Sequence, residues 1–255
     1  MRIRHDEARE RLRQLLQRRA RTDGLTPAAV ELLVENALLE RWGPADEIPA
    51  AAVAGDRASL LVVGAAKIVC ATPRGRHVTA GFVAPGQVIA VGAPHDAPEL
   101  WRDFRVIACD PLGTIVASWT IHAMAAVVGT LPAMQILQLF TTTWHAALRI
   151  VRDKCHLLGL GLRDRVLAVL AMLARDFGVP HPDGLRIELR LTHAEVADAA
   201  AGSRANVTRA LEELRASGLV AVEQHRLIVT RLGLAALHAD AATPVPWTPQ
   251  RTAVG

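Results

Sequence analysis

The amino-acid sequence predicts an α+β protein with an N-terminal β domain, one long helix and a C-terminal domain of short helices and strands. Three stretches support this fold class. Residues 48–118 contain short β-favouring runs, residues 132–158 have the apolar spacing of a helix, and residues 192–230 place two helical segments before a strand pair. With 255 residues, 51% of them hydrophobic, the chain is long enough to build cores for two modest domains.

The first 24 residues form a basic helical extension. Residues 9–20 have helical spacing, and arginines in this extension supply much of the formal net charge of +4. A second helix is expected over Pro27–Arg41, capped by Thr26 and with Pro27 in its first turn. The positive charge permits a polyanionic partner without requiring one. The extension either contacts that partner or shields the β domain, and we favour shielding.

Residues 25–131 are expected to form a compact all-β domain. Its apolar runs are separated by Gly, Pro and Asp, which is typical of a sandwich or barrel of the jelly-roll kind. The runs are SLLVVG, AKIVCA, HVTAGFV, QVIAVG, FRVIAC and GTIVAS.

Pro132 opens a long helical segment that continues to residue 158. Along it, a possible seam recurs at alternating steps of three and four residues, as in a coiled coil. The seam residues are Ile136, Phe140, Thr143, Ala147, Ile150, Lys154 and Leu157. The pattern predicts that two copies of the chain pair through this helix. The alternative is that the helix packs only on its own β domain.

Residues 159–240 are expected to form the C-terminal domain, after a flexible break at Gly159–Gly161. The sequence RVLAVLAMLARDF is predicted as a helix, GVPHPDG as a loop and LRIELRL as a half-buried strand. The last residues, 241–255, are rich in proline and are expected to be disordered.

Two short helices are expected to meet at a tight turn, Ala201–Gly202. Thr192 can cap the first helix, with Glu195 at the capping-box position, and Ser203 can cap the second. The second helix should run to about Ser217 and end at Gly218, and the strand pair that follows should turn near Gln224 and His225. This order of elements predicts a winged helix-turn-helix.

The outer face of the second helix has the side chains that a helix in a DNA groove needs. Arg204 and Arg209 lie in its first half, beside Ser203, Asn206 and Thr208. Arginine can donate two hydrogen bonds to a guanine edge, and short polar side chains can contact phosphates. The alternative is a solvated helix face with two incidental arginines.

The stretch LTHAEVADAAAGSRANVTRALEELRASGLV resembles the signature of the CRP/FNR superfamily of bacterial transcription regulators, with Ser203, Arg204, Val207 and Arg209 at its matching positions. Weaker likenesses are GDRASLLVVGAAKIV and FVAPGQVIA, which resemble the glycines and turns of the family's effector domain. The resemblance covers roughly Leu25–Leu237.

The resemblance implies a homodimer joined through the long helix, with one recognition helix of each subunit in the major groove of double-stranded DNA. Two-fold symmetry then implies a palindromic site with half-sites about one helical turn apart. It also implies RNA polymerase as a protein partner. The DNA-binding residues expected on this basis are Thr192, Ser203, Arg204, Ala205, Asn206, Thr208 and Arg209.

The sequence departs from the family in its recognition helix. The residue after Arg204 is often Glu in the family, where it accepts a hydrogen bond from a base. Here it is Ala205, which can offer only an apolar contact, for example to a thymine methyl group. We therefore expect a half-site unlike that of the cyclic-AMP-dependent members.

A second departure lies in the effector segment, AVGAPHDAPELWRDFRVIA. Arg102 matches the family's phosphate-binding arginine, but Asp103 and Phe104 follow it, and Gly92 or a neighbour replaces the glutamate that holds the ribose. A carboxylate beside a phosphate site is electrostatically unfavourable. We therefore expect an effector other than cyclic AMP, or none, since ligand-free DNA binding fits the sequence equally well.

Other cofactors find little support in the sequence, and the cofactor stays unknown. Three dispersed cysteines argue against an iron-sulfur cluster and against a disulfide framework, and they fit a reducing cytoplasm. Haem could use His77, His95 or Cys70, but no pair among them has a convincing spacing. The N-terminus lacks a signal peptide, and no apolar stretch is long enough to span a membrane, so a cytoplasmic protein is expected.

An enzyme is not expected, because the sequence has no Walker loop, dinucleotide fingerprint or Gly-x-Ser-x-Gly elbow. The stronger rival is a regulator that uses the helix-turn-helix to dock on another protein. The presence of both Arg204 and Arg209 on the outer face favours DNA over that rival.

Overall fold

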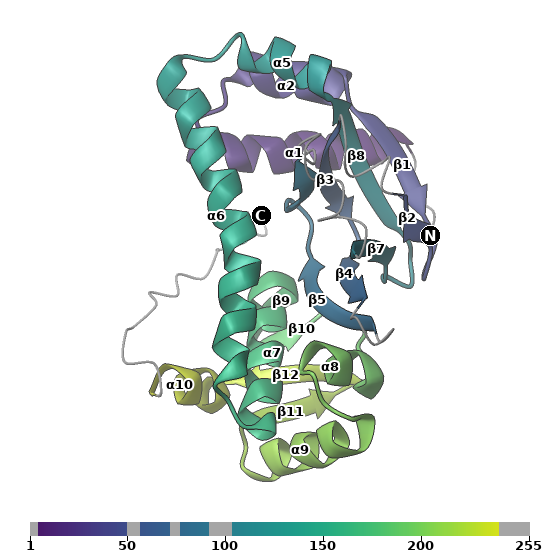
Figure 1. Ribbon diagram of the computed structural model, residues 1–255, viewed down its shortest axis with the longest axis vertical. Coiled ribbons are helices and arrows are strands. Elements are labelled where there is room, and N and C mark those ends of the chain that lie inside the picture. The colour runs from purple at the N-terminus through teal and green to yellow at the C-terminus, as the bar shows by residue number, and fades with distance from the viewer. Residues whose placement is uncertain (1–4, 50–56, 72–76, 92–103, 240–255) are drawn as a thin grey trace. The chain divides into compact units, whose positions relative to one another are not determined.

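The computed structural model describes residues 5–49, 57–71, 77–91 and 104–239 (Figure 1). Within these ranges, no helix has the length and apolar content that a membrane crossing requires. The expected disordered tail lies outside them. The chain divides into two compact units, Met1–His156 and Leu157–Gly255.

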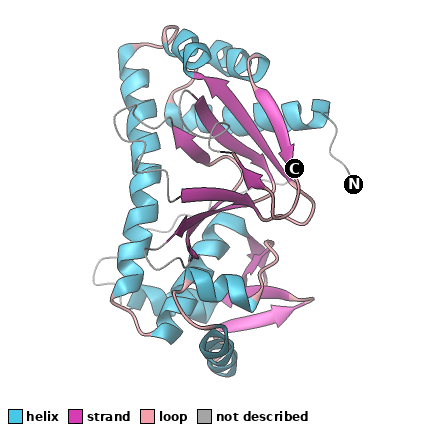
Figure 2. Cartoon of the chain, turned by 45° about the vertical axis from the view of Figure 1, so that its right-hand side comes forward, coloured by secondary structure: helices cyan, strands magenta, loops and turns pink. Residues whose placement is uncertain are grey.

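The first unit contains a β domain, the helices that cover it and most of the long helix (Figure 2). Its helices are α1 (His5–Asp23), α2 (Pro27–Glu35), α5 (Ile121–Val128) and α6 (Ala133–Leu158). Its strands are β1 (Leu38–Trp42), β2 (Glu47–Ile48), β3 (Arg57–Val63), β4 (Ala66–Ala71), β5 (His77–Val83), β6 (Val88–Val91), β7 (Phe104–Ala108) and β8 (Thr114–Thr120).

The described strands of the β domain form two four-stranded antiparallel sheets. One has the order β1-β8-β3-β6 and the other the order β2-β7-β4-β5. Consecutive strands repeatedly change sheet, which gives the jelly-roll-like arrangement that the sequence predicted. The sequence analysis predicted either a sandwich or a barrel, and the described strands form two separate sheets that do not close into a barrel.

Strand β3 is buried on both of its faces, which explains its continuous apolar run. Leu61 is fully buried and belongs to a core shared by both sheets, together with Ile68 and Val116. Leu60 and Val62 alternate with Leu61 along the strand and belong to a second core, formed with α1 and α2. Strands covered on both faces lose the alternation of apolar and polar residues that a half-exposed strand shows.

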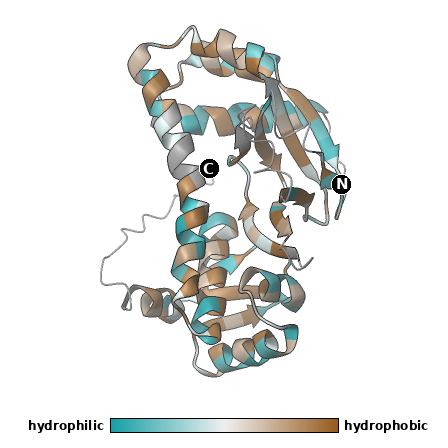
Figure 3. Ribbon diagram, viewed as in Figure 1, coloured by the Kyte–Doolittle hydropathy of each residue, from teal (hydrophilic) through white to brown (hydrophobic). Residues whose placement is uncertain are grey.

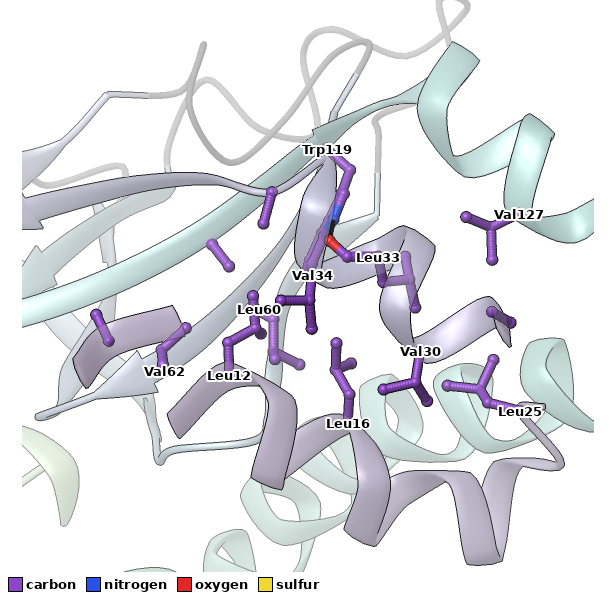
Figure 4. Close-up of a cluster of buried hydrophobic side chains, with 14 of the residues drawn as sticks. Leu12, Leu16, Leu25, Val30, Leu33, Val34, Leu60, Val62, Trp119 and Val127 are labelled. Atoms are coloured by element: carbon purple, nitrogen blue, oxygen red, sulfur yellow. Dashed lines mark hydrogen bonds between the residues drawn. The ribbon is translucent and has the colours of Figure 1, made fainter. Parts of the chain in front are cut away.

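Helix α1 contributes to this second core, here called the outer core (Figure 4). Leu12 is fully buried, and Leu16 lies in the same cluster as Leu60 of the sheet. Trp119 closes the cluster, and its indole N–H donates to the carbonyl oxygen of Leu33 at 2.7 Å. The N-terminal extension is therefore part of the folded β domain.

The arginines of α1 also make contacts within the β domain's own helices. The Arg13 guanidinium lies 3.0 Å from the Glu31 carboxylate, and Arg9 Nη1 donates to the Val34 carbonyl oxygen at 2.8 Å. Arg9 and Arg13 are therefore engaged within the β domain, whereas a DNA-binding extension would direct them toward phosphates. These contacts agree with the expectation that the extension shields the β domain.

The helix expected over Pro27–Arg41 ends earlier than predicted. Its start is confirmed, since Thr26 Oγ1 accepts a hydrogen bond from the Ala29 backbone N–H at 3.1 Å. The helix stops at Glu35, however, and Leu38–Trp42 is strand β1, which pairs with β8. Pairing with a distant strand outweighed the local helical pattern.

The seam predicted on α6 turns toward the chain itself wherever its side chains are described. Ile136 packs on the outer core, and Lys154 Nζ donates to the Thr79 carbonyl oxygen of β5 at 2.7 Å. Leu157 is buried. For these three residues the contacts favour the alternative, in which the helix packs on its own chain. The remaining seam side chains, Phe140, Thr143, Ala147 and Ile150, lie outside the described part of the structure.

The exposed apolar face of α6 lies one residue further along the sequence. Its most exposed members are Met134 at 73%, Leu137 and Val151 at 59%, and Leu158 at 81%. Together with Thr141, Leu148 and Cys155 they follow one another at steps of three, four or seven residues, which is the spacing of a coiled coil. This face is here called the outer seam, and its described members are Met134, Leu137, Thr141, Leu148, Val151, Cys155 and Leu158.

The second unit combines short helices with one antiparallel sheet of order β11-β12-β10-β9. Its helices are α7 (Leu162–Phe177), α8 (His193–Ala199), α9 (Arg204–Ala216) and α10 (Arg231–Ala239). Its strands are β9 (Gly178–His181), β10 (Gly184–Ile187), β11 (Val220–Glu223) and β12 (Arg226–Thr230).

Two expectations for this unit need correction. The segment GVPHPDG was predicted as a loop, but its first four residues form β9, which pairs with β10 through His181 and Gly184. The strand predicted over LRIELRL ends at Ile187, so it is shorter than its alternating pattern suggested. A proline near the end of β9 weakened the strand signal, although β9 lies at the sheet edge where proline is tolerated.

Candidate nucleic-acid interface

Two caps fix the helices α8 and α9 on either side of their turn. Thr192 Oγ1 accepts from the Glu195 backbone N–H at 3.2 Å, and Glu195 Oε2 accepts from the Thr192 backbone N–H at 2.9 Å. This is the predicted capping box. Ser203 Oγ accepts from the Asn206 backbone N–H at 3.3 Å, so the predicted second cap is also present. In the turn, Ala201 takes a φ of +51°.

The inner face of α9 is apolar and buried, and this determines which residues face outward. Val207 and Leu214 are fully buried and Leu211 is nearly so, and Val196 and Ala197 of α8 are buried as well. Figure 3 shows that hydrophobic and hydrophilic residues alternate along α9. Because this face is held against α7 and α8, the helix cannot rotate about its axis without exposing leucine and valine side chains.

The outer face of α9 brings four of the predicted DNA-binding residues together. Arg204, Ala205, Asn206 and Arg209 are all exposed. Within the described part of the chain, the guanidinium groups of Arg204 and Arg209 form neither a hydrogen bond nor an ion pair. Both groups are therefore available to a ligand. An exposed helix with two such groups in its first half can insert into a major groove and donate to guanine edges.

The other predicted residues have their hydroxyl groups engaged inside the domain. Thr192 and Ser203 are caps, as described above. Thr208 is half-buried, and its Oγ1 donates to the Arg204 carbonyl oxygen at 2.9 Å. The same Oγ1 lies 2.9 Å from Nδ1 of His193 on α8. These three residues therefore support the outer face of α9.

Sequence reasoning missed His193 as a neighbour of the recognition helix. It is exposed and occupies the first position of α8, directly after the Thr192 cap. No sequence spacing relates position 193 to Thr208. The two side chains meet only because α8 and α9 cross.

The wing of the domain has the turn that the sequence predicted. Glu223 pairs with Arg226, which leaves Gln224 and His225 as a two-residue loop with φ values of +49° and +61°. These are the angles of a type I′ hairpin. His181 Nε2 lies 2.8 Å from Glu223 Oε2 and ties the wing to strand β9.

The predicted effector residues, Arg102 and Asp103, lie outside the described part of the chain. So do His95 and the side chain of His77. The third haem candidate, Cys70, is half-buried on β4. Among the described residues, no three His, Cys, Asp or Glu side chains gather in a way that could hold a metal ion.

Comparison with known proteins identifies the C-terminal domain. Residues 164–238 match the family model of the Crp-like helix-turn-helix domain. The chain is 29% identical to the global nitrogen regulator of Synechococcus elongatus over 177 residues, which cover 68% of this chain and 77% of that protein. The global nitrogen regulator of a Synechocystis species is 28% identical over 177 residues, with 68% and 76% covered.

Solved structures show the same fold over most of the chain. FixK2 from Bradyrhizobium japonicum matches with a TM-score of 0.64 and 21% identity, over 82% of this chain and 99% of that one. A CRP-family transcriptional regulator from Thermus thermophilus matches with a TM-score of 0.57 and 22% identity, over 80% and 97%. A jelly-roll-like β domain and a long helix thus occur in one chain with a domain at residues 164–238 that matches the Crp-like helix-turn-helix family, and the chain is similar over most of its length to CRP-family regulators.

Proposed function

We propose that this chain is a sequence-specific DNA-binding regulator that inserts helix α9 of each subunit of a homodimer into the major groove of a palindromic operator. The observation that carries the proposal is the outer face of α9, where Arg204 and Arg209 are exposed and unengaged within the described part of the chain. We assign the protein no catalytic activity.

The residues of α9 divide by role. Arg204 and Arg209 donate to base edges, with guanine as the preferred acceptor. Asn206 contacts phosphate or an adenine edge, and Ala205 packs against a thymine methyl group. Thr192, Ser203 and Thr208 hold the helix in place through the hydrogen bonds described above. Because Ala205 stands where the family often has a glutamate, no base of the half-site is read by a carboxylate at this position.

The dimer forms through the outer seam of α6. Met134, Leu137 and Val151 are mostly exposed in the single chain, and their spacing fits pairing with the same face of a second copy. Burying a side chain of this size contributes about 1.5–3 kcal/mol. A two-fold axis along the paired helices then requires two half-sites of opposite orientation, about one helical turn apart.

Regulation acts through the dimer. A change in the β domain shifts the population of dimer arrangements and so changes the spacing of the two recognition helices. The effector is a molecule other than cyclic AMP, or the protein binds DNA constitutively without one. RNA polymerase is the protein partner that the family implies.

Selection of bound sequences from a random duplex library tests the proposal. The purified full-length chain is used with no added ligand. A two-fold symmetric consensus is the expected result, and it would show that the ligand-free protein is already competent. Should no sequence be enriched, the selection is repeated with cell extract. Enrichment only then would indicate a required effector, and continued failure would favour the protein-docking rival.

A further inference from the structure

A chain of hydrogen bonds links the first helix of the motif to the recognition helix. Thr208 Oγ1 lies 2.9 Å from the Arg204 carbonyl oxygen and 2.9 Å from Nδ1 of His193. A carbonyl oxygen can only accept, so the single hydroxyl hydrogen of Thr208 points toward Arg204. The bond to His193 therefore requires that Nδ1 carries a hydrogen and donates to Thr208.

This arrangement fixes what the other ring nitrogen of His193 can do. In the neutral ring, with the hydrogen on Nδ1, Nε2 is a lone-pair acceptor and faces a phosphate oxygen unfavourably. In the protonated ring both nitrogens carry hydrogen, and Nε2 becomes a charged donor. Thr208 thus leaves His193 able to bind an anion through Nε2 only when the ring is protonated.

The position of His193 places the ring at the edge of the proposed DNA interface. The side chain is exposed, and Thr208 lies one turn after Arg204 and directly before Arg209 on α9. In a helix-turn-helix bound to DNA, the first helix crosses the sugar-phosphate backbone that borders the groove. His193 begins that helix.

We propose that His193 is a DNA phosphate ligand, oriented by Thr208, and that formation of the DNA complex takes up a proton at this residue in each subunit. The proposal rests on the DNA-binding function proposed above. It adds that DNA affinity depends on pH, with acid favouring the complex.

Several charged groups lie on the elements packed against His193. On α9 these are Arg204, Arg209 and Glu212, and all three are exposed. On α8, the Glu195 carboxylate accepts from the backbone N–H of Thr192. A phosphate bound at Nε2 of His193 would bring a negative charge next to the ring, and an opposite charge nearby favours the charged form of a group.

The charged groups of α7, which also packs on α8, are largely paired with each other. Arg163 lies 3.3 Å from Asp164, and Arg175 lies 3.1 Å from Asp176. Arg165 is half-buried.

The test measures the affinity of the full-length protein for its selected duplex between pH 6 and pH 8 at constant ionic strength. Wild-type affinity is expected to fall as the pH rises, by up to about tenfold per pH unit for each proton taken up. The salt slope supplies a second readout. It should be steeper at pH 6 than at pH 8, by about 0.9 for each additional phosphate that the protein neutralises.

Variants assign the effect to its residues. H193A should bind with the weaker, alkaline affinity of the wild type at both pH values. H193K carries a permanent charge and should bind tightly at both. T208V keeps the shape of the side chain but removes the hydroxyl, and it should reduce the pH dependence without abolishing binding. H225A changes an exposed histidine at the wing tip and is the matched control. Its DNA affinity should depend on pH as that of the wild type does.

Three outcomes would overturn the inference. Wild-type affinity that is constant between pH 6 and pH 8 contradicts proton uptake. A pH dependence that survives in H193A, or disappears in H225A, assigns the proton to another group. Absence of sequence-specific duplex binding at every pH overturns the proposed DNA-binding function and this inference with it, which distinguishes that failure from the other two.

Discussion

The side chain of Lys154 is partly buried where α6 meets strand β5. It donates to the Thr79 carbonyl oxygen at 2.7 Å, and burial lowers the pKa of Lys154 because desolvation disfavours the charged form. The folded chain therefore releases this proton at a lower pH than the unfolded chain does. In the alkaline range below the ordinary lysine value of about 10.4, the unfolded chain binds more protons, so rising pH stabilises the fold at this residue.

We expect this contribution to appear as a difference between the wild type and K154M. Urea unfolding at pH 7 and pH 9.5 gives the free energy of unfolding of each protein. The wild type should gain stability relative to K154M as the pH rises, because methionine has no proton to lose. Other groups that titrate in this range cancel in the difference. A difference that stays constant, or moves in the opposite direction, would contradict the burial of the charged group.

At the scale of elements, features that depend on residues close together in the sequence were predicted well. The caps of α8 and α9 join residues three positions apart, so Thr192 with Glu195 and Ser203 with Asn206 were visible as short motifs. The outer face of α9 followed from the same short-range spacing.

Elements that depend on distant partners were predicted poorly. The residues of strand β1 were expected to be the end of the helix that begins at Pro27. Nothing in their sequence, LLERW, indicates that they pair with β8. Helix α5 was not predicted at all. His193 escaped notice for the same reason, since only the crossing of α8 and α9 brings it to Thr208. Each of these features is decided by tertiary contacts that override local preference.

The orientation of α6 shows this limit most directly. Two apolar stripes run along the helix one residue apart, and both have the spacing of a coiled coil. The sequence could not decide which stripe faces inward. Contacts of Ile136 with the outer core and of Lys154 with Thr79 decide it, and they leave the outer seam exposed.

Cys155 offers a direct test of the outer seam. It is exposed, while Cys70 and Cys109 are half-buried. In a parallel pair of helices, equivalent seam residues lie opposite each other, so a short bismaleimide should link Cys155 to its counterpart in the dimer. The cross-linked species is measured by denaturing gel electrophoresis.

Matched cysteine variants complete this experiment. C155S should abolish the cross-linked dimer, whereas C70S should leave it unchanged. A dimer that persists in solution but fails to cross-link through Cys155 would mean that the subunits pair through another surface.

At the scale of the whole molecule, the proposed function needs two surfaces, the outer seam of α6 and the outer face of α9. In the proposed complex, the outer seam supplies a two-fold axis and the outer face of α9 supplies contacts to one half-site. Neither alone produces an operator-binding protein, because a single recognition helix makes too few base contacts to select one site among the many in a genome. A variant that loses DNA binding while it keeps the dimer would separate the two functions.

The most direct measurement compares R204A/R209A with the wild type on the selected duplex. Affinity is measured by fluorescence anisotropy, and subunit number by light scattering. R215A changes an exposed arginine near the end of the same helix and serves as the control. The double variant should remain a dimer and lose at least about 100-fold in affinity, since each good base contact is worth about 1–3 kcal/mol, while R215A binds nearly as the wild type does. Unchanged affinity in the double variant would show that α9 is not the recognition helix.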